Sequence, residues 1–465
     1  MATNTRTLTD FGERYFATAQ LGDARRSRRL MKAANRISRH PGGSLPDKFQ
    51  SPSELKALYR LCDCEEVTHD SVLAPAKEHV SRRIEAHRGT VLVLHDTTEL
   101  DYTSNASLAD DLGTIGDGRG RGYICHNSLA VDPESRAVLG LTGQILHHRA
   151  SVPENESKTA RRQRSDRESR LWLRGTEQLA GEHRFVDVAD RGADSCEFLE
   201  HELHSGRRFV VRSAHNRITL AGHGQAHQRR RLHAYSRTLP ALGTKKMKVA
   251  HGVDRNARTA HLRLSAAPVR IVPPRQKKGE HGEDPLPLWV VRVWESNPPK
   301  GEAPLEWFLL TNEPVENRTD ALRVVRWYEC RWIIEEFHKA MKTGCKVEEL
   351  QFTAVERLEP MIALLSVVAV TLLNLRDLSR QPKARTQKAA EILSPEYINV
   401  LSGWRYKQLR SDLTIYDFFY ALARLGGHQN RRHDHPPGWL VLWRGWTKLQ
   451  SMVDGAIAIR RKKCG

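Results

Sequence analysis

The chain has 465 residues, in which 74 Lys and Arg outnumber 55 Asp and Glu to give a formal net charge of +19. Such a chain attracts polyanions, so nucleic acid is the first expected partner and an acidic membrane surface the second. The seven cysteines are scattered and odd in number, which excludes a disulfide framework and indicates a reducing compartment. The N-terminus lacks the apolar segment of a secretory signal, and the longest apolar run, 361–375, predicts a buried helix and not a membrane span.

The first 88 residues are expected to be helical. A helix over 24–39 is capped by Asp23 and ends before Pro41. One side of its helical wheel carries cations and no acid: Arg25, Arg28, Arg29, Lys32, Arg36 and Arg39. An ordinary solvated face mixes charge signs, so this side is interpreted as a surface that lies along the phosphates of nucleic acid.

Two more helices are expected before the chain changes character at Gly89. Ser51 and Glu54 form the pattern of a capping box, with Pro52 at the first helical position. The second helix is expected over 71–88.

Strands and helices then alternate, which predicts an α/β layer structure. Short apolar strands end in Asp96 and in Asp190, and a helix is expected directly after the second of them. The other expected elements are strands over 122–132, 137–148 and 207–212 and a helix over 165–180.

From about Ser213 to Lys300 the polar/apolar alternation predicts an all-β insertion with a long basic loop over 273–285. The histidines His223, His227 and His233 surround Arg229–Arg231. A metal site is one reading of these histidines, and a surface loop near an anion is the one we favour. The α/β pattern resumes at 305–311, and residues 380–465 are expected to be mostly helical, with Ser451 and Gly455 hinting at self-association.

Residues 328–342 have the composition and periodicity of one uninterrupted helix. Its wheel brings four functional groups onto one narrow face: Tyr328, Arg331, Glu335 and Lys342. A solvated face laced with ion pairs is the ordinary explanation. Apolar neighbours such as Trp332 and Phe337 favour a cleft that holds metal and phosphate.

Three acids complete the pattern: Asp96, Asp190 and Glu335. Each has a simple explanation as a turn former or a helix cap. Together they form an oxygen-only ligand set suited to Mg²⁺ or Mn²⁺, and two such ions stabilise both the attacking and the leaving oxygen of a phosphodiester displacement. Arg331 and Lys342 would hold neighbouring phosphates.

These residues carry a resemblance to the DDE transposases of the insertion-sequence-four family. The family signature Y-x2-R-x3-E-x6-K is present in full as Tyr328, Arg331, Glu335 and Lys342. The similarity extends over nearly the whole chain through these segments: Leu21-Gly-Asp-Ala-Arg-Arg, Asp96-Thr-Thr, Asp190-Arg191 with Asp194, Arg207-Arg-Phe-Val-Val-Arg-Ser, Trp307-Phe-Leu-Leu-Thr and Ala423-Arg-Leu-Gly-Gly.

The resemblance implies an α/β fold: a ribonuclease-H-like catalytic core with a β-rich insertion, flanked by N- and C-terminal helical domains. It implies a DNA-end-recognition domain over 1–88, a core over 89–378 with the insertion at 213–303, and a dimerisation region over 379–465. The implied partners are double-stranded DNA, as transposon ends and target, and a second copy of the chain when DNA is bound. A bacterial cytoplasmic location without membrane contact is expected.

The resemblance also implies roles for individual residues. Asp96, Asp190 and Glu335 would bind two Mg²⁺ ions, for which Mn²⁺ substitutes, and Tyr328, Arg331 and Lys342 would grip phosphates. Trp307 would stack on a base flipped out of the duplex, with Trp332 and Arg212 nearby. The implied reaction is metal-assisted nicking, hairpin formation, reopening by water and joining of the 3′ ends to target DNA.

The chain departs from the family pattern at two places. Gly192 stands where the family often has Glu, and Tyr123-Ile124 stands where a Trp pair is expected. Two other classes of protein stay open: a DNA-binding regulator descended from a transposase, and a general metal-dependent nuclease with the same core.

Overall fold

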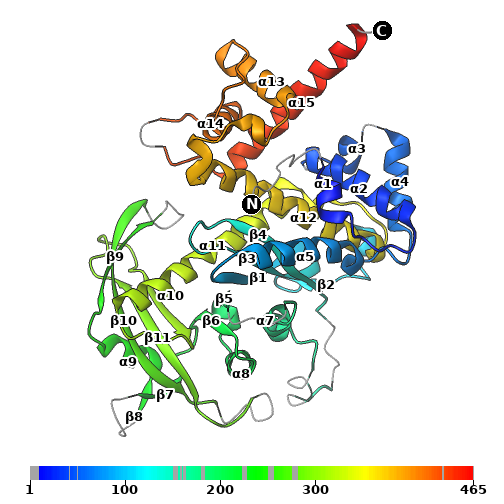
Figure 1. The fold of residues 1–465 in the computed structure, drawn as a ribbon. Helices are drawn as coiled ribbons and strands as arrows, with labels where there is room; N and C mark the ends of the chain where they lie inside the picture. The colour runs from blue at the N-terminus through cyan, green and yellow to red at the C-terminus, as the bar shows by residue number, and fades with distance from the viewer. Residues whose placement is uncertain are drawn as a thin grey trace.

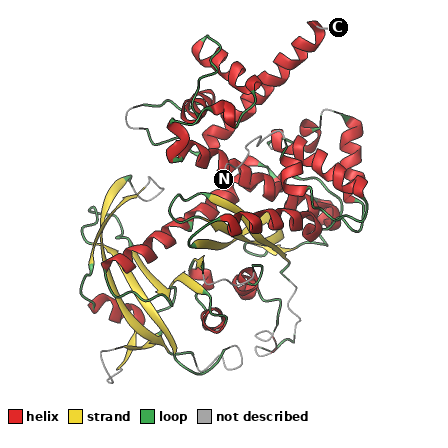
Figure 2. Cartoon of the chain, viewed as in Figure 1, coloured by secondary structure: helices red, strands yellow, loops and turns green. Residues whose placement is uncertain are grey.

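The computed structural model describes residues 10–40, 42–49, 51–149, 155–157, 160, 164–179, 184–221, 228–249, 256–274, 281–431 and 434–463. Helices from both ends of the chain lie beside one part of a long mixed sheet, near β1 to β4, and the other strands extend away from them (Figures 1 and 2). The class is therefore mixed α/β with helical N- and C-terminal parts, as predicted.

Five helices precede the first strand: α1 (Phe11–Phe16), α2 (Ala24–Arg39), α3 (Leu45–Lys48), α4 (Pro52–Cys62) and α5 (His69–Ala86). The prediction for α2 is confirmed, because the Asp23 carboxylate accepts a hydrogen bond from the Arg25 N–H at 2.7 Å. The apolar side of α2, which includes Leu30 and Ile37, is buried.

The capping box at the start of α4 is wrong, although the helix itself is present. The Ser51 hydroxyl lies 2.7 Å from the Ser53 hydroxyl, and the Glu54 carboxylate accepts a hydrogen bond from Arg36 Nε at 3.1 Å. A guanidinium on the neighbouring helix is a stronger partner for a carboxylate than a backbone N–H, so the tertiary contact prevails.

Twelve described strands form the sheet: β1 (Val91–Asp101), β2 (Gly113–Ile115), β3 (Gly120–Val131), β4 (Val138–His147), β5 (Phe185–Ala189), β6 (Arg208–Arg212), β7 (Ile218–Ala221), β8 (Gln228–Arg231), β9 (Gly243–Val249), β10 (Arg258–Ile271), β11 (Leu286–Glu295) and β12 (Glu306–Thr311). β4, β3 and β1 form an antiparallel meander, and β5 and then β6 pair in parallel beyond β1. This order, β4-β3-β1-β5-β6, is the ribonuclease-H-like arrangement that was expected.

The insertion extends the same sheet instead of forming a separate layer. β12 pairs with β6, and β11, β10, β7 and β8 follow in that order, while β9 pairs with β10. The all-β prediction is wrong in one respect, because α9 (Leu232–Thr238) lies between β8 and β9. Leu232 and Tyr235 are three residues apart and bury one face of this short helix, which the strand pattern of its neighbours concealed.

Among the described residues between β4 and β6, two α-helices are present. The helix predicted over 165–180 is only α7 (Leu171–Thr176) after a 3₁₀ turn, and α8 (Cys196–His204) follows β5 after another turn. Arg167 and Arg170 bind Glu197 at the start of α8, and Arg149 binds Glu168, so ion pairs hold the preceding segment in a non-helical path. Ala180 lies outside the described residues.

The remaining helices are α10 (Arg318–Cys330), α11 (Trp332–Lys339), α12 (Val355–Arg380), α13 (Pro395–Tyr406), α14 (Ile415–Leu425) and α15 (Trp439–Lys463). Among the described residues α12 is the one helix long and apolar enough to cross a membrane, but 83 % of its most apolar window is buried inside the protein. That burial confirms the expected core helix. α12 packs against α5, β4 and α15, so it joins the two helical ends of the chain to the sheet.

Candidate active site and DNA-binding surface

Asp96 and Asp190 occupy corresponding positions on two neighbouring strands. His95 on β1 pairs with Ala189 on β5 in parallel register, and each acid follows directly after its member of this pair. Adjacent strands lie about 4.8 Å apart, so the Asp96 and Asp190 carboxylates project from the same end of the parallel β1–β5 pair. The expectation that β1 ends at Asp96 is wrong, because β3 continues to pair with β1 from Asp96 to Asp101.

Arg331 links the third acid to the first. Its guanidinium donates to Asp96 Oδ2 at 3.0 Å and to Glu335 Oε1 at 2.5 Å. The Asp96 and Arg331 side chains are largely buried, while Glu335 is about one-third exposed. The sheet and α11 therefore bring the three predicted acids into one neighbourhood, with an arginine between two of them.

Electrostatics supports this closeness. The pKa of Asp96 is raised to about 7, chiefly by burial; Arg331 opposes the rise, and the nearby Asp190 and Glu335 contribute to it. A carboxyl in such surroundings gains from any cation that approaches it.

The single helix predicted over 328–342 is interrupted. α10 ends at Cys330, the Arg331 N–H bonds to the Tyr328 carbonyl only three residues back, and residues 340–344 form a π-turn. Side-chain periodicity does not encode a change of hydrogen-bond register. Here the register changes where the Arg331 side chain is anchored to β1.

Of the other predicted DNA contacts, Tyr328 lies near this centre, close enough for Arg331, Arg212 and Asp190 to influence its hydroxyl. Tyr328 is buried, shares a hydrogen bond with Arg212, and packs edge-on against Trp307 with ring centroids 5.5 Å apart. Burial raises the pKa of Tyr328, which keeps its hydroxyl a donor. Trp332 is 57 % exposed and presents an open aromatic face, contrary to the expectation that it would enclose the polar stripe.

Lys342 lies toward the far end of β1. Its ammonium is 3.0 Å from Glu348 Oε1, and the same oxygen accepts the backbone N–H of Asp101 at 3.0 Å. Lys342 is thus paired with Glu348, and not with Asp96 or Glu335.

The acids fit a divalent cation by donor type, since all their ligand atoms are carboxylate oxygens. Among the described residues no group of three or more His, Cys, Asp or Glu is arranged to hold a metal ion. The Arg331 guanidinium takes the place of a cation between Asp96 and Glu335. Loading of a metal requires Arg331 to release at least one of these acids.

On the face of the sheet opposite the Asp96 side chain, a buried polar group links β1 to β5. Asp187 accepts hydrogen bonds from His95 Nε2 at 2.9 Å and from Arg207 Nε at 2.7 Å, and its carboxylate is fully buried. We did not anticipate this group from the sequence. The available signal is a polar residue next to apolar ones in each strand, His95 after the apolar first four residues of β1 and Asp187 within β5.

Packing accounts for both departures from the family pattern. A Cβ added at Gly192 would lie 2.3 Å from Cζ2 of Trp172, so Trp172 fills the space that a larger residue needs. Tyr123 and Ile124 are buried in β3, where the Tyr123 hydroxyl donates to Glu359 at 2.9 Å. Neither residue of that pair presents a surface to DNA.

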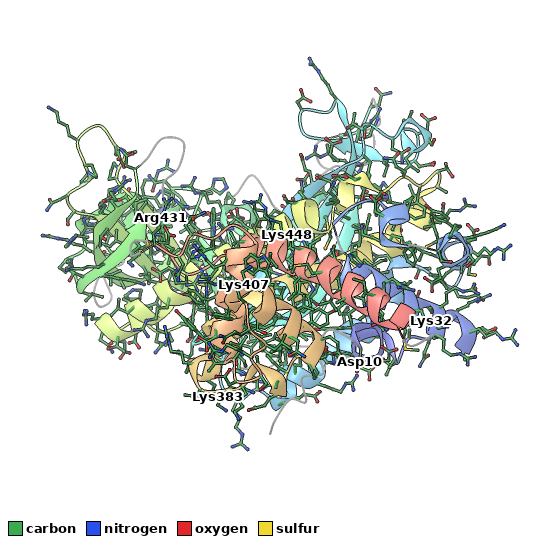
Figure 3. All side chains as sticks on the ribbon, turned by 90° about the horizontal axis from the view of Figure 1, so that it is seen from above. Asp10, Lys32, Lys383, Lys407, Arg431 and Lys448 are labelled. Carbon is green, nitrogen blue, oxygen red and sulfur yellow. The ribbon has the colours of Figure 1, made fainter. Side chains whose placement is uncertain are left out.

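The cationic side of α2 is a second candidate site. Arg25, Arg28, Arg29 and Lys32 are exposed, and they line a groove of about 700 Å³ between α2 and α4. Figure 3 shows Lys32 at the periphery of the molecule. Within the groove Arg36 is paired with Glu54, while Arg26 lies off the groove and is paired with Glu66 at 2.6 Å.

A ribonuclease-H-like sheet with clustered carboxylates, together with a helix that exposes four cations, defines a class of nucleic-acid-processing proteins. Residues 9–67 match the family model described as transposase DNA-binding. The match contains α2 and the whole groove, and it supports a transposase that binds DNA.

Proposed function

We propose that the chain is a cut-and-paste transposase of the insertion-sequence-four type, similar to the transposase of the kanamycin-resistance transposon five. In this proposal the α2 groove binds the inverted repeats at the transposon ends. The acid cluster nicks the ends, forms and opens hairpins, and joins the 3′ ends to target DNA, and the active species is a DNA-bound homodimer.

One observation carries the catalytic part of the proposal. Asp96 and Asp190 follow a parallel strand pair, and Arg331 connects Asp96 to Glu335. These contacts support a role for the three acids in one site, although they lie far apart in the sequence.

Asp96, Asp190 and Glu335 would hold two Mg²⁺ or Mn²⁺ ions, which supply charge neutralisation and an activated water for phosphodiester displacement. The protein's own groups bind and orient the DNA. Arg331, once released from the acids, pairs with a phosphate in bidentate fashion, and the protonated Tyr328 hydroxyl donates to another phosphate oxygen. Trp307 and Trp332 provide ring faces for unstacked bases.

The test uses the DNA that flanks the gene. The full-length protein is incubated with duplexes that carry any inverted repeats found there, with Mg²⁺ or with EDTA. We expect excised fragments with hairpin ends only in the presence of Mg²⁺. Specific binding without any cleavage would instead favour the regulator, and cleavage of unrelated duplexes would favour the general nuclease.

A further inference from the structure

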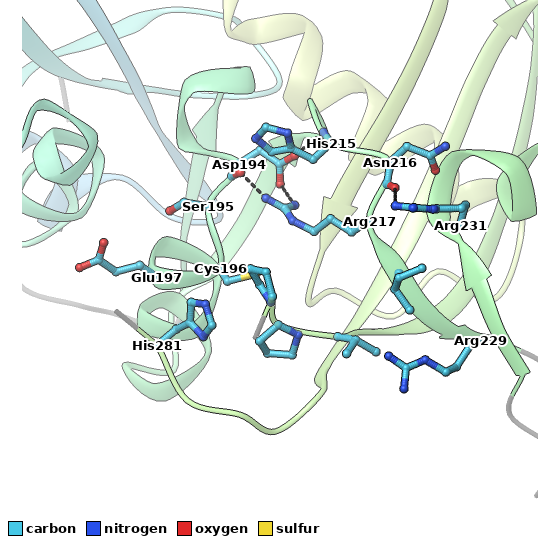
Figure 4. Close-up of a pocket in the computed structure, with 14 residues that line it drawn as sticks. Asp194, Ser195, Cys196, Glu197, His215, Asn216, Arg217, Arg229, Arg231 and His281 are labelled. Carbon is cyan, nitrogen blue, oxygen red and sulfur yellow. Dashed lines mark hydrogen bonds and ion pairs between the residues drawn. The ribbon is translucent and has the colours of Figure 1, made fainter. Parts of the chain in front are cut away.

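A cationic pocket lies in the insertion, away from the α2 groove. It occupies about 600 Å³ between the first turn of α8 and the β7–β8 hairpin (Figure 4). Its polar lining includes three arginines and two histidines: His215, Arg217, Arg229, Arg231 and His281. From the sequence, Arg229–Arg231 are expected to belong to a surface loop near an anion. The three arginines form the exposed strand β8 instead, while His223 and His227 lie outside the described residues.

The two acids that line the pocket, Asp194 and Glu197, are each paired with arginines of the protein. Arg217 is paired with the buried Asp194, whose Oδ2 also accepts the N–H groups of Ala214 and His215 at 2.6 and 3.0 Å. Glu197 is held by Arg167 at 2.7 Å and by Arg170 at 2.6 Å. The lining consequently keeps the positive charge of Arg229 and Arg231.

Strand geometry aims Arg229 and Arg231 at the pocket. Successive side chains of a strand point to opposite faces, and these two residues pair with Leu220 and Ile218 of β7. Arg230 points the other way and lies over the ring of Tyr235, 5.8 Å from its centroid. The Arg231 guanidinium donates to the Asn216 carbonyl at 3.2 Å, which holds the group in place without cancelling its charge.

His233, the third histidine of the sequence pattern, does not line the pocket. Its ring stacks on Phe308 with centroids 4.1 Å apart, and its Nε2 lies 3.0 Å from the Ser213 hydroxyl. In contrast, Nε2 of His281, which does line the pocket, is buried with no hydrogen-bond partner among the described residues. Nδ1 of the same ring lies 2.7 Å from the Gly282 carbonyl oxygen and carries the first ring proton, so Nε2 donates to a ligand oxygen only when the ring holds a second proton.

The rest of the lining suits a nucleic-acid strand. Ile218, Val272, Pro273 and Pro274 form an apolar wall that can contact a sugar, and β8 is an exposed edge strand, so a polymer can enter from the side. Asp194 follows Asp190 by four residues, so their Cα atoms lie within about 15 Å of each other. DNA carries a phosphate about every 3.4 Å along each strand, so a duplex held at the acid cluster presents further phosphates over that distance.

We propose that this pocket binds a backbone phosphate of duplex DNA outside the cleaved bond, with Arg229 and Arg231 as its ligands. The inference rests on the proposed function, because it takes DNA as the substrate of the same protein. It adds a contact region in the insertion, separate from the α2 groove. The ordinary alternative is that the arginines protect an edge strand from pairing with another chain.

Arg230, which lies on the same strand but points away from the pocket, serves as the control. We compare Arg229→Glu, Arg231→Glu and Arg230→Glu in the full-length protein, which change the charge equally on one strand. Binding to random-sequence duplex is measured in EDTA over a range of salt concentrations. We expect the Arg229 and Arg231 variants to bind duplex DNA at least about fivefold more weakly than the wild type. The slope of log K against log salt concentration should be shallower by about 1 in these variants, and the Arg230 variant should match the wild type.

Several outcomes overturn the proposal. Equal losses in all three variants indicate a general charge effect, and unchanged binding with increased light scattering in all three indicates edge protection. Calorimetry with inorganic phosphate and with a nucleoside monophosphate forms a separate arm. Tight binding of either ligand, lost in the Arg229 and Arg231 variants while duplex binding is unchanged, assigns the pocket to a free small anion.

Thermal unfolding identifies any variant that does not fold, and for it Arg→Gln at the same position replaces Arg→Glu. Since all binding is measured without divalent ions, the result does not depend on cleavage. The proposed function fails separately, if transposon ends are not cut with Mg²⁺.

Discussion

The α2 groove and the acid cluster use charge in opposite ways. In the groove four cations are exposed, and the one acid of its lining is paired with Arg36. In the acid cluster Arg331 is bound to Asp96 and Glu335, and Lys342 is bound to Glu348. The exposed cations of the groove can bind an anion without rearrangement. The charged groups of the acid cluster are paired with one another, so they must exchange partners before they bind a ligand. Binding and chemistry should therefore be separable by mutation.

The largest expected effect comes from the acids. Asp96→Asn, Asp190→Asn and Glu335→Gln each keep the side-chain shape and remove the charge, so cleavage should fall by at least about 10³-fold while end binding stays within a few-fold. Single-turnover cleavage with Mg²⁺ and filter binding in EDTA measure the two quantities.

Asp101→Asn is the matched control, because Asp101 is an exposed acid at the end of the same strand. It should cleave like the wild type. Near-normal cleavage by any of the three acid variants would remove that acid from the ligand set.

The next effect concerns binding alone. Replacing Arg25, Arg28 and Arg29 together by Ala should weaken end binding about tenfold or more and reduce the salt slope by up to about 2.7, because each lost phosphate contact contributes about 0.9. Titrations at several salt concentrations measure the slope.

Arg26→Ala tests the same helix at a position engaged within the protein, by Glu66 and by the Leu21 carbonyl. It should lower stability and leave the slope unchanged. A slope that is the same in the triple variant and the wild type would contradict a DNA contact by α2.

The smallest effect compares two tryptophans. Trp332 is 57 % exposed, so Trp332→Ala should leave thermal stability nearly unchanged and weaken DNA binding about fivefold or more, as expected for loss of one stacking platform. Trp307 packs on Tyr328, so Trp307→Ala should lower the melting temperature and impair hairpin formation more than the first nick. Equal losses at the two steps would argue against stacking by Trp307.

The sequence predicted what local rules determine. The cap and the amphipathic pattern located α2 to the residue, and apolar runs located core strands and the two acids that follow them, Asp96 and Asp190. It did not predict that β1 continues beyond Asp96, since that depends on pairing with β3. The Arg331 bridge and the His95–Asp187–Arg207 group join residues far apart in the chain, so no local pattern contains them.

The family signature gave Glu335 and Arg331 but not their geometry. Periodicity treated them as neighbours on a regular helix, whereas the change of register at Arg331 and the π-turn after Lys339 set their positions. Gly192 illustrates the same limit. A larger residue is excluded there by the ring of Trp172, which belongs to an element about twenty residues earlier.

The continuation of β1 past Asp96 affects how firmly the backbone of each acid is held. Asp96 belongs to a strand bonded to β3 throughout and to β5 up to the preceding residue, so its backbone serves as a fixed reference point. Glu335 sits on an eight-residue helix between two irregular turns and has the freer side chain. In the proposed function, adjustment to different intermediates would fall to the helix, and chemical steps of differing shape would share one immobile anchor.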